Sequence, residues 1–189
     1  ESFPEYLDAL EARQADIDFA AQLPHSALRV FVMGERGAAR EPATAADLAA
    51  MRGIVREAVD AGAIGVTTSQ SHGHRTVDGE LAPSVDAAQD ELLALAQGLA
   101  DAGTGVFQLI PNSQYGCDPV EEMALFRRIV EVSGRPLSFS LLEKKYQPDL
   151  PALMLDMVAE ANRDGYPIRA QVFPRPIGML FGLELSFHP

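Results

Sequence analysis

The sequence predicts an α/β fold, and three of its features support this prediction. Short apolar runs of strand length alternate with longer segments whose apolar residues recur at helical spacing. The short runs are almost continuously apolar, as is typical of parallel strands covered by helices. No glycine-rich phosphate-binding turn follows any of these runs, which disfavours a dinucleotide-binding sheet. We therefore expect a partial TIM-like (β/α) barrel of about five or six parallel strands with outer helices.

Capping residues and apolar periodicity place the individual elements. Ser2, Thr44, Ser84 and Asp118 are suited to begin helices, and glycines such as Gly134 stand where helices should end. The expected helices span residues 3–13, 44–62, 84–102, 118–134 and 149–164. The expected strands span residues 17–23 (an ambiguous segment), 28–33, 64–68, 105–110, 137–142 and 168–173. Residues 34–37 and 69–83 are expected to be loops.

Composition excludes several classes of protein. The chain has 189 residues, of which 47% are hydrophobic and 22% charged, as in ordinary folded domains. Its net charge of -12 opposes binding to nucleic acid and to anionic membranes. No apolar run approaches the roughly 20 residues of a membrane span. A single cysteine, Cys117, excludes an internal disulfide and a cysteine-rich zinc site, so the reducing cytoplasm is the expected location.

The densest group of polar side chains follows the strand expected at residues 64–68. In a barrel the active groups lie after the strands, at their carboxyl ends, which directs attention to this loop. His72 and His74 are two residues apart and could bind one zinc ion, while Arg75 and Asp78 could orient a carboxylate substrate and a water. A single His-x-His is a weak signal, so we favour the alternative in which the histidines hold turns together.

Other charged side chains are weaker candidates. Arg169 and Arg175 flank the last expected strand, and either could bind a carboxylate through two hydrogen bonds. The alternative for each is a salt bridge to one of the many acidic residues. Lys144 and Lys145 are interpreted as exposed loop charges, and Cys117 as a neutral loop thiol.

Several stretches resemble the middle of the N-acyl-D-amino-acid deacylase (D-aminoacylase-like) family of the amidohydrolase superfamily. These are residues 2–7, 32–37, 62–69, 74–79, 134–141, 169–172 and 175–178. The resemblance implies a barrel that hydrolyses a non-peptide C–N amide bond with a zinc-activated water. It also implies a carboxylate that transfers protons during the reaction. It also implies that the family's early His-x-His, its bridging cysteine and its late aspartate lie outside this chain. Cys117 does not match that cysteine.

The chain departs from the family pattern at the ends of two middle strands. Where the resemblance implies histidine ligands, the sequence has Ile110 and either Leu141 or Leu142, which cannot bind zinc. We therefore expect the metal ligands to lie outside this chain or to be replaced, and we predict none within it. The resemblance includes the loop that carries His74, Arg75 and Asp78, which favours a substrate-binding role there.

Two functions are compatible with the sequence. The first is a fragment of a metal-dependent amidohydrolase, inactive alone, whose substrate is an N-acyl amino acid or a similar small amide. Residues 1–189 would then be a single segment of a barrel domain truncated at both ends. The alternative is a non-catalytic binding or assembly module derived from a barrel, self-associating through uncovered edges. Neither function involves nucleic acid or a membrane.

Overall fold

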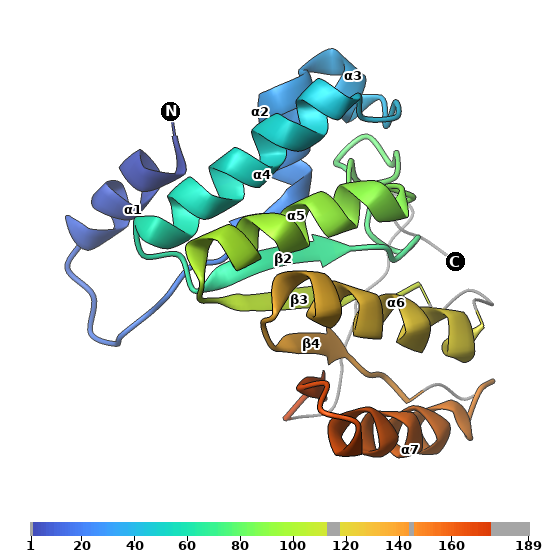
Figure 1. Cartoon of the computed structure of the whole chain (residues 1–189). Helices are drawn as coiled ribbons and strands as arrows, with labels where there is room; N and C mark the ends of the chain where they lie inside the picture. Colours follow the sequence, from blue (N-terminus) through green and yellow to red (C-terminus); the bar gives the residue numbers. More distant parts are fainter. Residues whose placement is uncertain (1, 113–117, 144–145, 175–189) are drawn as a thin grey trace.

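The computed structural model describes residues 2–112, 118–143 and 146–174. Strands and helices alternate along most of this length (Figure 1). The strands are β1 (Leu23–Pro24), β2 (Gly65–Ser69), β3 (Val106–Ile110), β4 (Leu137–Ser140) and β5 (Ile168–Gln171). The helices are α1 (Phe3–Glu11), α2 (His25–Met33), α3 (Glu35–Ala38), α4 (Ala45–Asp60), α5 (Gln89–Ala102), α6 (Pro119–Ser133) and α7 (Leu150–Arg163).

The five strands form one parallel sheet whose spatial order is the chain order, β1-β2-β3-β4-β5. Figure 1 shows α4, α5, α6 and α7 lying in the same order along one side of this sheet. A doubly wound sheet would reverse its strand order at a switch point and place helices on both sides. The singly wound arrangement is the one found in a (β/α) barrel, so the predicted partial barrel is confirmed.

The strand register separates the sheet into two faces. Val66, Phe107, Leu137 and Ile168 are register partners and all belong to the buried core beneath the helices. Because side chains alternate along a strand, the residues between these rows point to the opposite side of the sheet. That opposite side, here called the polar face, carries mainly hydroxyl and carboxamide side chains: Thr67, Ser69, Gln108, Ser138, Ser140 and Gln171.

The core between sheet and helices is well packed. The rings of Phe126 on α6 and Phe139 on β4 lie 4.9 Å apart between their centroids, both fully buried. Gly65 is the first residue of β2 and has a φ of +150°. At this residue the backbone of β2 approaches that of β3 closely. A Cβ there would lie 2.0 Å from the carbonyl oxygen of Val106, so only glycine allows β2 to pair with β3 at this point.

Helix starts agree with the sequence in most cases. Ser2 and Thr44 both form capping boxes, with Glu5 and Asp47 respectively, and the Asp118 side chain accepts a hydrogen bond from the backbone of α6. Gly134 ends α6 in the left-handed conformation, as predicted.

The predicted start at Ser84 of the helix expected at residues 84–102 is wrong. Asp86 has φ of +62°, which interrupts the helix, and α5 begins only at Gln89. The Ser84 side chain is buried and donates to the backbone oxygen of Ser69 at 2.9 Å instead.

β4 and β5 end two residues earlier than predicted, and the larger differences lie before residue 40. Residues 28–33, predicted as a strand, form most of α2, whose buried residues 25, 28, 29 and 33 recur at helical spacing. Residues 17–23 contribute to the sheet only at Leu23, the first residue of β1. Residues 34–37, predicted as a loop, include most of the short helix α3.

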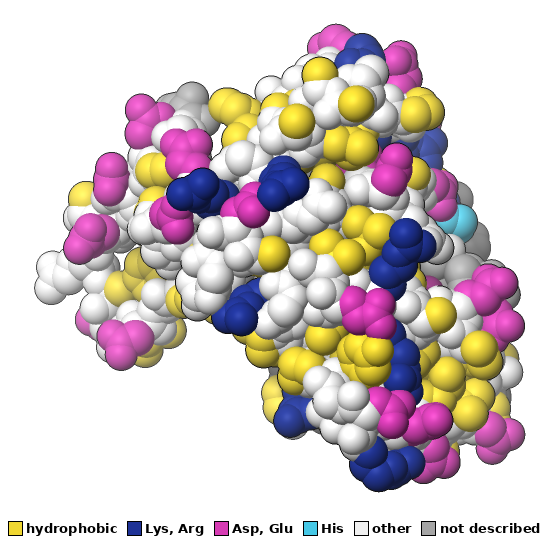
Figure 2. All heavy atoms as spheres, in the orientation of Figure 1, with side chains coloured by type: hydrophobic (Ala, Val, Ile, Leu, Met, Phe, Trp, Pro, Cys, Tyr) yellow, Lys and Arg dark blue, Asp and Glu magenta, His cyan; other side chains and the backbone are white. Residues whose placement is uncertain are grey.

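Figure 2 shows basic and acidic side chains interspersed on the face covered by helices, without one gathered basic patch. None of the helices that the structure describes is long and apolar enough to cross a membrane.

Candidate functional site at the carboxyl edge of the sheet

The carboxyl ends of the parallel strands lie together at one edge of the sheet, where barrel enzymes place their reactive groups. On the polar face near this edge, the Gln108 carboxamide donates to that of Gln171 at 3.1 Å. The two residues belong to β3 and β5, so their side chains meet across β4. Ser138 and Ser140 of β4 lie on the same face. Apart from Arg169, the register partner of Ser138, the polar side chains named on this face are uncharged donors and acceptors, which suit a polar ligand such as an amide.

The loop after β2 carries a small hairpin over residues 74–82, here called the β2 hairpin. Arg75 and Leu81 form an antiparallel bridge, and the backbone of Ala82 donates to His74 at 2.9 Å. Thr76 donates through its backbone to Glu80 at 2.8 Å. The loop predicted from the sequence is thus an ordered turn.

Three predicted site residues lie on the β2 hairpin, namely His74, Arg75 and Asp78. All three are exposed, so a ligand at this edge could reach them. The Arg75 guanidinium also donates to the Gly79 oxygen at 2.7 Å, which steadies the turn. The structure therefore brings these three residues into one local unit.

The remaining predicted site residues are not brought to the hairpin. Arg169 is the second residue of β5 and pairs with Ser138, so it lies inside the strand rather than beside it. Its guanidinium donates to the Asn162 side chain of α7 and to the Ile168 oxygen. β5 is separated from β2 by two strands. Arg175 lies outside the described residues, as do Cys117, Lys144 and Lys145.

A metal centre is not formed by the side chains that the structure describes. No group of three His, Cys, Asp or Glu residues in residues 2–112, 118–143 and 146–174 could hold a metal ion. His72 lies 2.8 Å from the Asp86 carboxylate through its Nε2. Ile110 lies on the polar face at the carboxyl edge of the sheet, where the resemblance implies a metal ligand. Leu141 belongs to the core beneath the helices. Neither side chain has a donor atom, so the described residues do not fit a metal site.

Sequence reasoning missed a buried polar cluster behind the edge. Here called the buried cluster, it consists of His25, Arg29, Thr68 and Glu91. His25 Nδ1 lies 2.8 Å from the Thr68 hydroxyl, and its Nε2 lies 2.7 Å from a carboxylate oxygen of Glu91. Arg29 Nε is 2.6 Å from the same oxygen. The four residues are at most 4% exposed, so the charges of Arg29 and Glu91 are paired inside the protein.

The protonation states of the buried cluster follow from its contacts. Burial lowers the pKa of His25, because a second cation beside Arg29 would be poorly solvated. Burial alone would raise the pKa of Glu91, but its contacts with His25 and Arg29 outweigh that effect and lower it. An ionised Glu91 only accepts hydrogen bonds, so Nε2 of neutral His25 donates to it and Nδ1 accepts from Thr68.

A hydroxyl, an imidazole and a carboxylate in this order resemble the triads of hydrolases. Thr68, however, is 4% exposed and points toward the helices, away from the polar face. A substrate could not reach its hydroxyl, so we interpret the buried cluster as structural. The signal that could have revealed it is the four-residue spacing of His25 and Arg29, visible only once residues 25–33 are treated as a helix.

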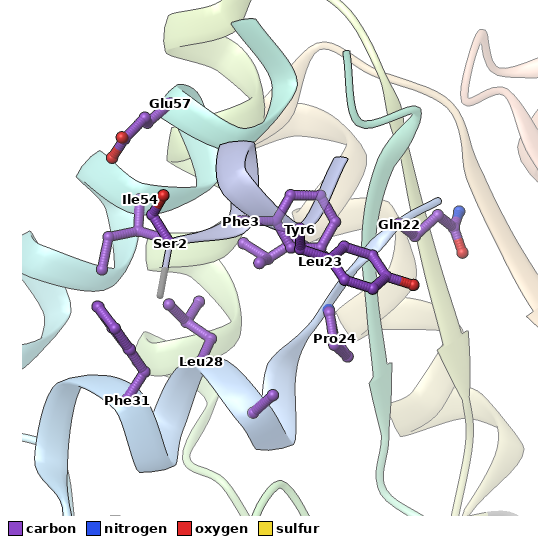
Figure 3. Close-up of a pocket in the computed structure, with 11 residues that line it drawn as sticks. Ser2, Phe3, Tyr6, Gln22, Leu23, Pro24, Leu28, Phe31, Ile54 and Glu57 are labelled. Atoms are coloured by element: carbon purple, nitrogen blue, oxygen red, sulfur yellow. The ribbon is translucent and has the colours of Figure 1, made fainter. Parts of the chain in front are cut away.

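The structure also contains an apolar cavity of about 370 Å³ between α1, β1, α2 and α4 (Figure 3). Phe3, Tyr6, Leu28 and Phe31 line much of it, and Glu57 is its charged lining residue. None of the predicted site residues contributes to this cavity. Its lining lacks a group of converging polar side chains that could orient a substrate, so we do not assign the reaction to this cavity.

The singly wound parallel sheet with polar groups at its carboxyl edge is typical of (β/α)-barrel proteins. Comparison with known proteins identifies the family. The model of the amidohydrolase family matches residues 1–188, and the chain belongs to that family.

Within the family, the chain is similar to D-aminoacylases, which confirms the resemblance found in the sequence. It is 34% identical to the D-aminoacylase of Alcaligenes xylosoxydans xylosoxydans over 103 residues, which are 54% of this chain and 19% of that protein. A D-aminoacylase structure that defines a novel subset of amidohydrolases matches with a TM-score of 0.71 at 24% identity. A second, concerned with the binuclear metal centre of D-aminoacylase, matches with a TM-score of 0.73 at 24% identity. Each match covers 92% of this chain and 34% of the solved chain.

Proposed function

We propose that this chain forms one arc of the barrel of an amidohydrolase that hydrolyses a linear amide, such as an N-acyl-D-amino acid. The singly wound parallel sheet with a polar face is the observation that carries the proposal. Family membership and similarity to a D-aminoacylase support the reaction class. The chain spans 19% of that curated relative, so the activity belongs to the whole protein.

In this proposal the β2 hairpin lines the mouth of the substrate site. The exposed guanidinium of Arg75 attracts the substrate carboxylate, since it keeps N–H groups beyond the one that donates to Gly79. Asp78 accepts a hydrogen bond from the substrate amide, and His74 contacts the substrate beside it. Arg169 and Arg175 are weaker candidates for the same carboxylate. Gln108 and Gln171 present carboxamides deeper on the polar face.

A relative of this chain has a binuclear metal centre, and zinc is the metal that the sequence resemblance implies. The described residues do not fit such a centre, so its ligands would come from outside them. This chain's part is then to hold and orient the substrate. We accordingly expect the chain to be inactive in isolation. Its cytoplasmic location stays a prediction.

The assay uses the full-length protein, N-acetyl-D-amino acids, and either added zinc or a chelator. We expect turnover with zinc and its loss with the chelator. Arg75→Gln should raise KM with little change in kcat, because the hairpin binds substrate without touching the reacting atoms. Val77→Ala is the matched control, since Val77 is 92% exposed on the same hairpin and makes no polar side-chain contact. Absence of turnover in both metal conditions would contradict the proposal.

A non-catalytic binding or assembly module is the second candidate. Ile110 and the leucines at 141 and 142 favour it, because they stand where ligands are expected. Exposed aromatic side chains near β1, Phe19 and Phe31, could then serve self-association. Light scattering decides this point, since a monomer over the whole concentration range would argue against assembly.

A further inference from the structure

Arg29 connects α2 to residues 37–41, which follow shortly in the chain, and to Pro83, which is distant in the sequence. Its guanidinium donates to the Pro83 oxygen at 2.7 Å, directly after the β2 hairpin, and to the Glu41 oxygen at 2.6 Å. It also donates to the Gly37 oxygen at 3.5 Å, in α3. Arg29 itself lies in α2, the helix that follows β1. One buried side chain thus fastens two surface segments to a helix of the core.

The surroundings of Arg29 are built to keep it in place. Its Nε lies 2.6 Å from Glu91, which supplies the compensating charge. A Cβ on Gly37 would lie 2.5 Å from the Arg29 carbonyl oxygen, so α3 packs directly against the backbone of α2. Hydrogen bonds involving a charged donor in a buried site are stronger than neutral ones, and here the acceptors are backbone carbonyl groups of α3 and of two loops.

The β2 hairpin has a second anchor in Ser84. Its hydroxyl donates to the Ser69 oxygen at 2.9 Å, and the Ser26 hydroxyl donates to it at 2.9 Å. Both anchors attach the hairpin to α2 and to the end of β2. The other hydrogen bonds given for the hairpin among the described residues are internal or join it to adjacent residues, such as those from Ala82 to His74 and from His74 to Ser71. The attachments at Pro83 and Ser84, which include a hydrogen bond from the Gln70 side chain to the Ser84 oxygen at 2.9 Å, therefore contribute to its position over the edge of the sheet.

We propose that Arg29 is a positioning residue, whose guanidinium, balanced by Glu91, holds the β2 hairpin at a fixed place over the carboxyl edge of the sheet. It contacts no substrate and acts through the Pro83 carbonyl. The consequence for substrate binding rests on the function proposed above, whereas the consequence for hairpin order does not.

The test is Arg29→Lys in the full-length protein, followed by hydrogen exchange with mass spectrometry. Lysine keeps the charge that Glu91 requires, but its single ammonium cannot also reach both loop carbonyls. We expect exchange of the hairpin amides, including those of Thr76 and Ala82, to accelerate about tenfold. Amides of β2 and α5 should keep their protection. Substrate KM should rise while kcat is nearly retained.

Arg52→Lys is the matched control, because Arg52 makes an exposed ion pair with Asp101 and contacts no hairpin residue. It should leave hairpin exchange unchanged. Unaltered hairpin exchange in Arg29→Lys, or equal acceleration throughout the core, would overturn the proposal.

Ser84→Ala provides a second route if Arg29→Lys does not fold. It removes the other anchor, so hairpin exchange should again rise selectively, and a uniform rise would count against positioning by these anchors. If the wild-type protein turns over no N-acyl-D-amino acid, the proposed function fails while the exchange result still decides the role of Arg29.

Discussion

Helix α5 is tied to its neighbours by two ion-pair clusters that differ in burial. At its beginning, Glu91 contacts Arg29 and His25 of α2, and all three side chains are almost fully buried. Near its end, Asp101 accepts two hydrogen bonds from Arg52 of α4, at 2.5 and 2.8 Å, in a largely exposed place. The exposed pair has the better geometry, with two parallel bonds. Burial, however, decides what each cluster does.

The difference follows from solvation. In an exposed pair the two side chains exchange contacts with water for contacts with each other, so the pair adds little to the free energy of unfolding. In a buried cluster each charge depends on its partner, so loss of one member leaves the other unsolvated. Removing a member of the buried cluster should therefore disturb the fold and the loops attached to it, whereas removing a member of the exposed pair should not.

The largest effect is expected for Arg29→Met. This variant leaves the Glu91 carboxylate buried beside a neutral histidine and leaves the Pro83 and Glu41 carbonyls without their donor. The free energy of unfolding, measured by urea titration, should fall by about 3–5 kcal/mol.

The double variant Arg29→Met with Glu91→Gln sharpens this prediction. Glutamine still accepts from His25 but carries no charge, so the double variant should be more stable than Arg29→Met alone, by about 1 kcal/mol or more. Strictly additive losses would show that the two charges do not depend on each other.

An intermediate effect is expected from acid. The pKa of His25 is lowered in the folded state, so the unfolded chain binds a proton at this residue first as the pH falls below about 6.5. Folding stability should therefore decline from that pH downward, by at most about 1.4 kcal/mol per pH unit. The pKa of Glu91 is also lowered, so its contribution is present above its ordinary value near 4.5 and is lost at lower pH.

Urea titrations between pH 5 and 8 measure this slope. His25→Gln should flatten it between about pH 6.5 and 5. His74→Gln on the exposed hairpin is the control and should leave it unchanged. An equal slope in all three proteins would contradict the buried neutral histidine.

The smallest effect is expected for Asp101→Asn. Asparagine keeps one acceptor for Arg52, and water solvates the guanidinium, which loses only the negative charge of its partner. The Tm should change less than in any variant of the buried cluster. A loss comparable to that of Arg29→Met would invalidate the comparison on which these predictions depend.

Most of the fold could be predicted from the sequence because its signals are local. Thr44 with Asp47, and Asp118 before a proline, identify helix starts within a few residues. The strand prediction for residues 28–33 is wrong because an apolar run of six residues is compatible with both a buried strand and a buried helix. In the structure this run is helical, and Arg29 within it contacts Glu91, which is distant in the sequence.

The candidate site was predictable only where it is local as well. His74, Arg75 and Asp78 are neighbours in the chain, and the structure places them on one hairpin. Arg169 lies within β5 rather than beside it, and the apolar run at residues 168–173 does not show that its side chain contacts Asn162 of α7. The buried cluster joins residues from α2, β2 and α5, and the only local pattern within it is the spacing of His25 and Arg29 on α2.

The hydrogen bond between Gln108 and Gln171 has a geometric consequence. It joins strands that are next-nearest neighbours, whose backbones are about 9–10 Å apart in a flat sheet. Two extended carboxamide side chains can span that gap on the polar face. The bond therefore links β3 directly to β5 past the intervening β4, so that a substitution at either glutamine removes a connection between two strands that share no backbone hydrogen bonds.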